Sequence, residues 1–122
     1  MTSKKILVIE DNMQNMYLMH FLLEKKGYTV IEALTGTQGI EAARNECPDI
    51  ILLDIQLPEM DGYAVAAELR KISGLEAVPI IAVTSYAMAG DRERILAAGA
   101  TDYIEKPINP LTFVDQIKIY HL

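Results

Sequence analysis

Residues 48–62 read PDIILLDIQLPEMDG and give the strongest evidence for the fold of this chain. Four apolar residues, 50–53, stand directly before Asp54, and a segment with the turn-forming residues Pro58 and Gly62 follows. A short, continuously apolar run with turn signals after it predicts a strand that is buried on both faces. Such strands are typical of parallel sheets covered by helices, so this stretch predicts an α/β fold with a carboxylate at a strand end.

Similar apolar runs on both sides of this stretch predict four further strands, at residues 6–9, 28–33, 80–83 and 103–104. Segments with helical spacing of apolar residues alternate with them, at residues 13–26, 37–46, 63–72, 91–98 and 110–120. Alternating strands and helices with short connections imply right-handed crossovers and helices on both faces of a parallel sheet. We therefore expect a flavodoxin-like (βα)5 three-layer sandwich.

The polarity of the runs predicts the order of the strands. Residues 6–9, 50–53 and 80–83 are continuously apolar, as central strands must be, whereas residues 28–33 and 102–105 include polar side chains that suit edge strands. This favours the order 2-1-3-4-5, which reverses direction between the first and third strands. Open parallel sheets bind ligands at the carboxyl ends of the strands beside such a reversal, so we expect the functional site there.

Composition excludes several classes of protein. With 122 residues, of which 51% are hydrophobic, the chain suits one domain that spans residues 1–122, without an output domain. A formal net charge of −6 repels nucleic-acid backbones and anionic membrane surfaces, so neither is an expected partner. The single Cys47 and the absence of a signal-peptide pattern favour the reducing cytoplasm.

Three carboxylates are predicted to meet at the carboxyl edge of the sheet. Glu10 and Asp11 follow the first strand, and Asp54 follows the third. Carboxylates this close repel one another, and a divalent cation relieves the repulsion. Because the donors are all oxygen, they favour Mg²⁺, which keeps coordination positions for water and for phosphate oxygens.

A hydroxyl and an ammonium group are expected at the same edge. Thr84 closes the fourth strand and Lys106 closes the fifth. Together with Mg²⁺ they could hold the oxygens of a phosphoryl group, and Asp54 could act as the nucleophile and form an acyl phosphate. Each residue alone also fits a structural role, as a cap, a strand residue or a solvated lysine, but their common position favours function.

The sequence resembles the receiver domains of two-component response regulators, particularly regulators that lack an output domain. The resemblance spans nearly the whole chain and rests on ILVIEDN (6–12), PDIILLDIQLPEMDG (48–62), VPIIAVTS (78–85) and AAGATDYIEKP (97–107). It implies that Asp54 is the phosphoacceptor and that Glu10 and Asp11 hold Mg²⁺ directly or through water. It further implies that the Gln56 backbone carbonyl joins the metal, that Thr84 is a switch hydroxyl and that Lys106 binds phosphate.

The resemblance also assigns roles near the predicted fifth strand. Tyr103 matches an aromatic switch residue whose ring moves inward when Thr84 is drawn to the phosphate. A half-buried edge tyrosine is an equally good interpretation of the resting state. The Lys106–Pro107 bond matches one that is usually cis in the family. Tyr86 occupies a position beside the path of the hydrolytic water, where its ring could slow self-dephosphorylation or could instead face a partner.

Other residues have structural interpretations. We expect Met13, Met16 and Met19 to pack in the core, and His20 and His121 to be ordinary helix residues. Asp61 and Gly62 predict a turn in which Gly62 is available for a positive φ.

The leading hypothesis is a signalling protein rather than an enzyme with an external substrate. A sensor histidine kinase or phosphotransfer protein phosphorylates Asp54 in a step that the receiver itself catalyses with Mg²⁺, and a downstream protein target binds the changed face formed by the fourth helix, fifth strand and fifth helix. A Mg²⁺-dependent aspartyl-phosphate phosphatase is an alternative, but such enzymes carry D-x-D after the first strand. A constitutive pseudo-receiver docking module is a third reading, but neither the acceptor, the acids nor the lysine is missing.

Overall fold

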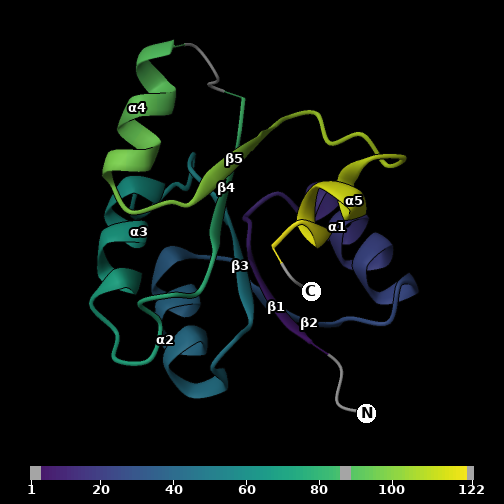
Figure 1. Cartoon of the computed structure of the whole chain (residues 1–122), viewed down its shortest axis with the longest axis horizontal. Coiled ribbons are helices and arrows are strands. Elements are labelled where there is room, and N and C mark those ends of the chain that lie inside the picture. The colour runs from purple at the N-terminus through teal and green to yellow at the C-terminus, as the bar shows by residue number, and fades with distance from the viewer. Residues whose placement is uncertain (1–3, 86–88, 121–122) are drawn as a thin grey trace.

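The computed structural model describes residues 4–85 and 89–120. Within them, five strands alternate with five helices (Figure 1). The strands are β1 (Lys5–Ile9), β2 (Thr29–Ala33), β3 (Ile50–Asp54), β4 (Ile80–Thr84) and β5 (Asp102–Glu105). The helices are α1 (Met13–Lys25), α2 (Gly36–Glu46), α3 (Gly62–Arg70), α4 (Ala89–Ala97) and α5 (Phe113–Lys118). No helix in the described part of the chain is long and apolar enough to cross a membrane.

The strands form one parallel sheet in the order β2-β1-β3-β4-β5, which confirms the predicted fold. The continuously apolar strands β1, β3 and β4 are central, and the strands with polar residues, β2 and β5, lie at the edges. The register pairs Ile9 with Leu53 and Asp54 with Val83. The carboxyl ends of the three central strands are therefore level.

Helices cover both faces of the sheet. Helices α2, α3 and α4 lie on one face, and α1 and α5 lie on the other (Figure 1). Successive strand residues enter different cores: Leu7 and Leu53 pack in the core under α2–α4, whereas Val8 and Leu52 pack in the core under α1 and α5. This alternation explains why the central strands must be apolar at every position.

Local signals in the sequence explain most helix ends. Asn12, Thr35 and Asp61 accept hydrogen bonds from backbone N–H groups at the starts of α1, α2 and α3. Gly27 and Gly99, which follow α1 and α4, adopt positive φ angles of 92° and 119°. The Lys106–Pro107 peptide bond is cis, as the resemblance implied.

Two helices, α3 and α5, are shorter in the structure than the sequence predicted. The helix expected at residues 110–120 begins at Phe113, because Thr112 and Phe113 donate backbone hydrogen bonds to the Asn109 carbonyl and so complete a turn before α5. The helix expected at residues 63–72 ends at Arg70, and Ile72 N–H bonds to the Leu69 carbonyl in a tighter turn.

Two expectations about single residues were wrong. Met16 and Met19 are buried as predicted, but the Met13 side chain is 62% exposed. Gly62 is the first residue of α3 and does not adopt a positive φ. A glycine is needed at position 62 instead because the start of α3 approaches the end of β3 closely. A Cβ atom at this position would clash with the Ile55 Cα atom and lie 2.8 Å from the Asp54 carbonyl oxygen.

Candidate functional site

The sheet register brings the three predicted carboxylates together. Ile9 pairs with Leu53, so Glu10 and Asp54 follow directly at adjacent positions, and Asp11 is next along the chain. One carboxylate oxygen from each of the three residues lies within 4.8 Å of the other two. Glu10 is 0% exposed and Asp54 is 2% exposed, whereas Asp11 faces solvent. The cluster therefore has two buried members and one accessible member.

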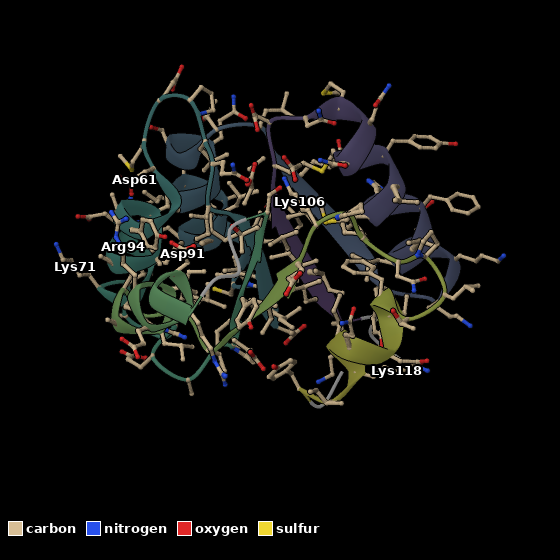
Figure 2. All side chains as sticks on the ribbon, turned by 90° about the horizontal axis from the view of Figure 1, so that it is seen from above. Asp61, Lys71, Asp91, Arg94, Lys106 and Lys118 are labelled. Carbon is tan, nitrogen blue, oxygen red and sulfur yellow. The ribbon has the colours of Figure 1, made fainter. Side chains whose placement is uncertain are left out.

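Lys106 reaches this cluster from the far side of β4. Its backbone N–H donates to the Thr84 carbonyl oxygen at 2.8 Å, which fixes the start of its side chain at the carboxyl edge. Its Nζ atom lies 2.9 Å from Glu10 Oε1 and 3.4 Å from Asp54 Oδ1. Figure 2, which looks down from above Figure 1, shows Lys106 between the two helix layers. The ammonium group partly balances the two buried carboxylates.

Glu10 holds its proton more strongly than an ordinary glutamate. Burial is the main cause, and the neighbouring Asp54 adds to it, while Lys106 acts in the opposite direction; together they raise the pKa of Glu10 to about 7. Despite its ion pair with Lys106, Glu10 Oε1 is buried and makes no hydrogen bond of suitable geometry within the described residues. A buried oxygen of this kind, among other carboxylates, fits a divalent cation such as Mg²⁺.

Backbone groups orient the two buried carboxylates. The N–H of Gln56 donates to Asp54 Oδ1 at 2.9 Å, and the N–H of Asn12 donates to Glu10 Oε2 at 3.2 Å. Each carboxylate is therefore held by the loop that follows its own strand. The Gln56 side chain also faces the next loop, because Ser85 N–H lies 3.4 Å from Gln56 Oε1.

Thr84 and Tyr103 share the face of the sheet that α2, α3 and α4 cover. Thr84 ends β4 and is fully buried. Tyr103 pairs with Ala82, two residues before Thr84, and packs half-buried against the core under α2–α4. Strand alternation places Thr84, Ala82 and Tyr103 on this same face. Tyr86, the residue predicted to shield the phosphate, lies outside the described residues, as does His121.

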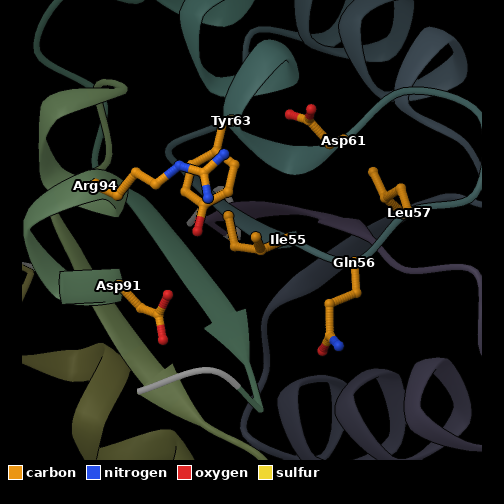
Figure 3. Close-up of a pocket in the computed structure, with 7 residues that line it drawn as sticks. All are labelled: Ile55, Gln56, Leu57, Asp61, Tyr63, Asp91 and Arg94. Atoms are coloured by element: carbon orange, nitrogen blue, oxygen red, sulfur yellow. The ribbon is translucent and has the colours of Figure 1, made fainter. Parts of the chain in front are cut away.

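A pocket of about 520 Å³ adjoins the site between the β3–α3 loop, α3 and α4. Gln56 contributes to both places, but Glu10, Asp11 and Lys106 do not line the pocket. Figure 3 shows the Arg94 guanidinium stacked on the Tyr63 ring, with its central carbon 4.3 Å from the ring centroid. The acidic cluster and this pocket are therefore separate features of the structure.

The sequence interpretation missed two contacts. The close approach of Gly62 had a readable signal, since a glycine directly after the N-cap residue Asp61 has no role in capping. His20 is more than an ordinary helix residue, because its Nδ1 atom lies 2.7 Å from Glu32 and its Nε2 atom lies 3.1 Å from Glu24. The spacing of His20 and Glu24 on one helix could be read from the sequence, but the contact with β2 could not.

Comparison with known families agrees with this geometry. The family profile described as response regulator receiver domain matches residues 6–118. The chain belongs to this receiver family. Receiver domains act in signalling, bind Mg²⁺ at an acidic pocket and interact with histidine kinases and phosphotransfer proteins. In this receiver, Glu10, Asp11 and Asp54 form an acidic cluster at the carboxyl edge of the sheet.

Among curated relatives, the receiver is similar to the polar-differentiation response regulator DivK. It is 43% identical to DivK of Brucella ovis over 118 residues, which cover 97% of this chain and 96% of that protein. For DivK of Brucella anthropi the identity is 44% over 117 residues, covering 96% and 95%.

Solved structures show the same architecture. The receiver domain of sensor histidine kinase PA1611 from Pseudomonas aeruginosa has a TM-score of 0.89 at 35% identity, with 98% of each chain covered. That structure has a magnesium ion coordinated in its active site cleft. Chemotaxis protein CheY4 of Vibrio cholerae has a TM-score of 0.94 at 25% identity, covering 98% of this chain and 99% of that one.

Proposed function

We propose that Asp54 accepts a phosphoryl group from the phosphohistidine of a sensor histidine kinase or phosphotransfer protein. The observation that carries this proposal is the buried Asp54 carboxylate beside a second buried acid, Glu10, and the Lys106 ammonium group. They meet at the carboxyl edge of the sheet, where the strand order reverses between β1 and β3. An Asp54 oxygen forms the new bond to phosphorus while the bond from phosphorus to the histidine nitrogen breaks. The electron pair of that bond stays on the imidazole, which takes a proton from solvent.

Each residue near Asp54 has a role in this reaction. Glu10, Asp11, Asp54 and the Gln56 backbone carbonyl hold Mg²⁺, which when bound neutralises charge on the phosphoryl oxygens. The Lys106 ammonium group binds a phosphoryl oxygen. It then gives up part of its contact with Glu10 and Asp54. The Gln56 N–H keeps the Asp54 carboxylate oriented. The close packing of the three carboxylates and their all-oxygen chemistry support this assignment.

The signal then passes to the face of the sheet that α2, α3 and α4 cover. The Thr84 hydroxyl donates a hydrogen bond to the phosphoryl group, and Tyr103 moves inward toward Thr84. The register supports this step, because Tyr103 lies beside Ala82 on the face that Thr84 occupies. The altered surface of α4, β5 and α5 binds a downstream protein target.

The phosphodonor contacts α1. This helix begins directly after the acidic loop, and Met13, Tyr17 and Phe21 form an exposed apolar stripe along it. The Tyr17 and Phe21 rings stack with centroids 6.3 Å apart, which gives a continuous surface. A protein that covers the first turn of α1 also reaches the carboxyl edge where Asp54 lies. We propose in addition that residues 1–122 act as one receiver domain, which the coverage of 96% of DivK supports.

The proposal is tested by phosphorylation with a small phosphodonor, phosphoramidate, followed by intact mass spectrometry. We expect one added phosphoryl group only when Mg²⁺ is present, and none in Asp54→Asn. Asp115→Asn, on the exposed surface of α5, is the matched control and should be phosphorylated like the wild type. Equal labelling of Asp54→Asn would show that Asp54 is not the acceptor. An unlabelled wild type would favour the constitutive docking module.

A further inference from the structure

Helix α4 is attached to the molecule by few side chains. Of its described side chains only that of Ile95 is buried. Two exposed arginines that precede Ile95 in the helix, Arg92 and Arg94, add contacts with neighbouring elements. Arg94 stacks on Tyr63 of α3, and the Arg92 guanidinium carbon lies 5.9 Å from the centroid of the Tyr103 ring on β5.

The spacing of the two arginines along α4 points their side chains in different directions. Residues two apart on a helix are separated by roughly 200° around its axis, so Arg92 and Arg94 extend to opposite sides of α4. Arg94 therefore reaches α3, whereas Arg92 reaches the edge strand. Of these two contacts, the one made by Arg92 involves the proposed switch residue.

Tyr103 meets Arg92 with its ring in the half-buried position that the structure gives it. Tyr103 is half-buried and lies beneath an exposed arginine, which is the arrangement expected of the resting state. A cation above an aromatic ring at an exposed site favours that arrangement by about two- to fivefold in population. When the ring turns inward toward Thr84, the guanidinium loses this partner.

We propose that Arg92 is a positioning residue that holds Tyr103 in its outward, resting position and so sets how readily the receiver switches. The inference rests on the proposed function, because it takes Tyr103 as the switch. Coupling between the two sites is reciprocal. If Arg92 stabilises the outward ring, loss of Arg92 must strengthen the binding of any ligand that needs the ring inward.

The test measures the affinity of the Mg²⁺-bound receiver for beryllofluoride, a mimic of the aspartyl phosphate. We expect Arg92→Gln to bind the mimic about two- to fivefold more tightly than wild type, and Arg92→Lys, which keeps a cation, to stay closer to wild type. Arg44→Gln removes the same charge from the exposed surface of α2 and should leave the affinity unchanged. In a Tyr103→Leu background, Arg92→Gln should have no effect.

The sign of the effect separates this role from simple attraction of an anion. If Arg92 acted only as a nearby positive charge, Arg92→Gln would weaken binding of the mimic. Equal or weaker binding would therefore overturn the proposal, as would the same gain in the Tyr103→Leu background.

A second measurement does not depend on the phosphorylation chemistry. A double-mutant cycle of Arg92→Gln and Tyr103→Leu compares the free energies of unfolding of the unphosphorylated proteins. We expect a coupling free energy between the two residues that corresponds to the same two- to fivefold factor. A coupling free energy of zero would overturn the proposal. Failure of the wild type to bind the mimic would count against the proposed function. The cycle would then still decide whether Arg92 holds Tyr103.

Discussion

Glu10 is the residue that makes the acidic cluster sensitive to pH. Its raised pKa of about 7, caused first by burial and then by Asp54, means that a proton competes with any cation for its carboxylate near neutrality. We predict that Mg²⁺ affinity is constant above this pKa and falls up to about tenfold per pH unit below it. Calorimetric titration with MgCl2 between about pH 6 and pH 8 measures this dependence.

Glu10→Gln is the control for this prediction. The amide carries no titrating proton, so the variant should bind Mg²⁺ more weakly at every pH and lose the dependence described above. An affinity that does not change in the wild type across the same range would show that Glu10 is not a metal ligand.

Gly62 shows how one missing side chain shapes the site. We predict that Gly62→Ala lowers the free energy of unfolding by about 1–3 kcal/mol, because the added methyl group meets backbone atoms of Ile55 and Asp54 that cannot move aside. Urea unfolding measures the change. Gly90→Ala is the matched control, since a Cβ atom there meets nothing within 4 Å among the described residues and the helix gains an alanine.

The two substitutions should therefore change the free energy of unfolding by different amounts and in different directions. Gly90→Ala should be neutral or stabilising by up to about 1 kcal/mol. Equal unfolding free energies for wild type and Gly62→Ala would mean that the β3–α3 loop relaxes freely, and the close approach would then have no structural importance.

These residues also show what could be predicted from the sequence. Glu10, Asp54 and Lys106 could be placed together because each directly follows or ends a strand, and parallel strands align their carboxyl ends. The requirement for a glycine at position 62 could not be predicted, because it depends on where α3 begins relative to Ile55. The raised pKa of Glu10 depends on a burial that only the packed structure defines.

At the scale of elements, His20 joins α1 to the edge strand β2. Both ring nitrogens face carboxylates, Glu32 on β2 and Glu24 on its own helix. Burial would lower the pKa of His20, but hydrogen bonds and charges of these two glutamates outweigh it and raise the pKa above its usual value. The imidazolium form therefore stabilises the folded state.

The sign of the pH dependence follows from this raised pKa. The stabilisation is complete below the unfolded pKa of about 6.5 and is lost as the pH rises through the higher folded value. We predict that the free energy of unfolding falls over this range, by up to about 1 kcal/mol, through the loss of this bridge. Urea unfolding of wild type and His20→Gln at about pH 6 and pH 8.5 isolates the contribution of His20.

His20→Gln should be less stable than wild type at the lower pH and nearly equal to it at the higher pH. A constant difference between the two proteins at both values would contradict the charged bridge. Pairing α1 with β2 in this way could not be predicted from the sequence, because Glu32 is 12 residues from His20 and their contact depends on the crossover between β1 and β2.

Arg70 is a second example of a contact between elements that local patterns do not reveal. At the end of α3, its guanidinium donates to the carbonyl oxygens of Val78 at 2.7 Å and Gly99 at 2.8 Å. These bonds join α3 to the loop before β4 and to the turn after α4. The helical spacing correctly predicted α3 itself, but the end of the helix at Arg70 reflects this tertiary role.

At the scale of the whole molecule, Mg²⁺ should stabilise the fold. The folded chain brings together carboxylates from two strands, and the unfolded chain separates them, so the cation binds the folded state preferentially. We predict that free Mg²⁺ at about ten times its dissociation constant raises the free energy of unfolding by roughly 1.4 kcal/mol. Urea unfolding at increasing MgCl2 measures the effect.

Sodium chloride at matched ionic strength is the control for the net charge of −6, because general screening acts on the whole acidic surface. Equal stabilisation by both salts would show that MgCl2 acts through general screening and not through a specific Mg²⁺ site. Asp54→Ala should also respond less to MgCl2 than wild type, since the cluster then has two carboxylates instead of three.

The alternation of residues between two separate cores has an evolutionary consequence. The proposed phosphodonor surface on α1 and the α4 part of the proposed switch surface are supported by different sets of strand residues, whereas α5 shares the core of α1. A lineage can therefore substitute residues under one helix layer without repacking the other. After gene duplication, a descendant of this chain could therefore change the strand residues beneath α1 while it keeps those beneath α4, or the reverse.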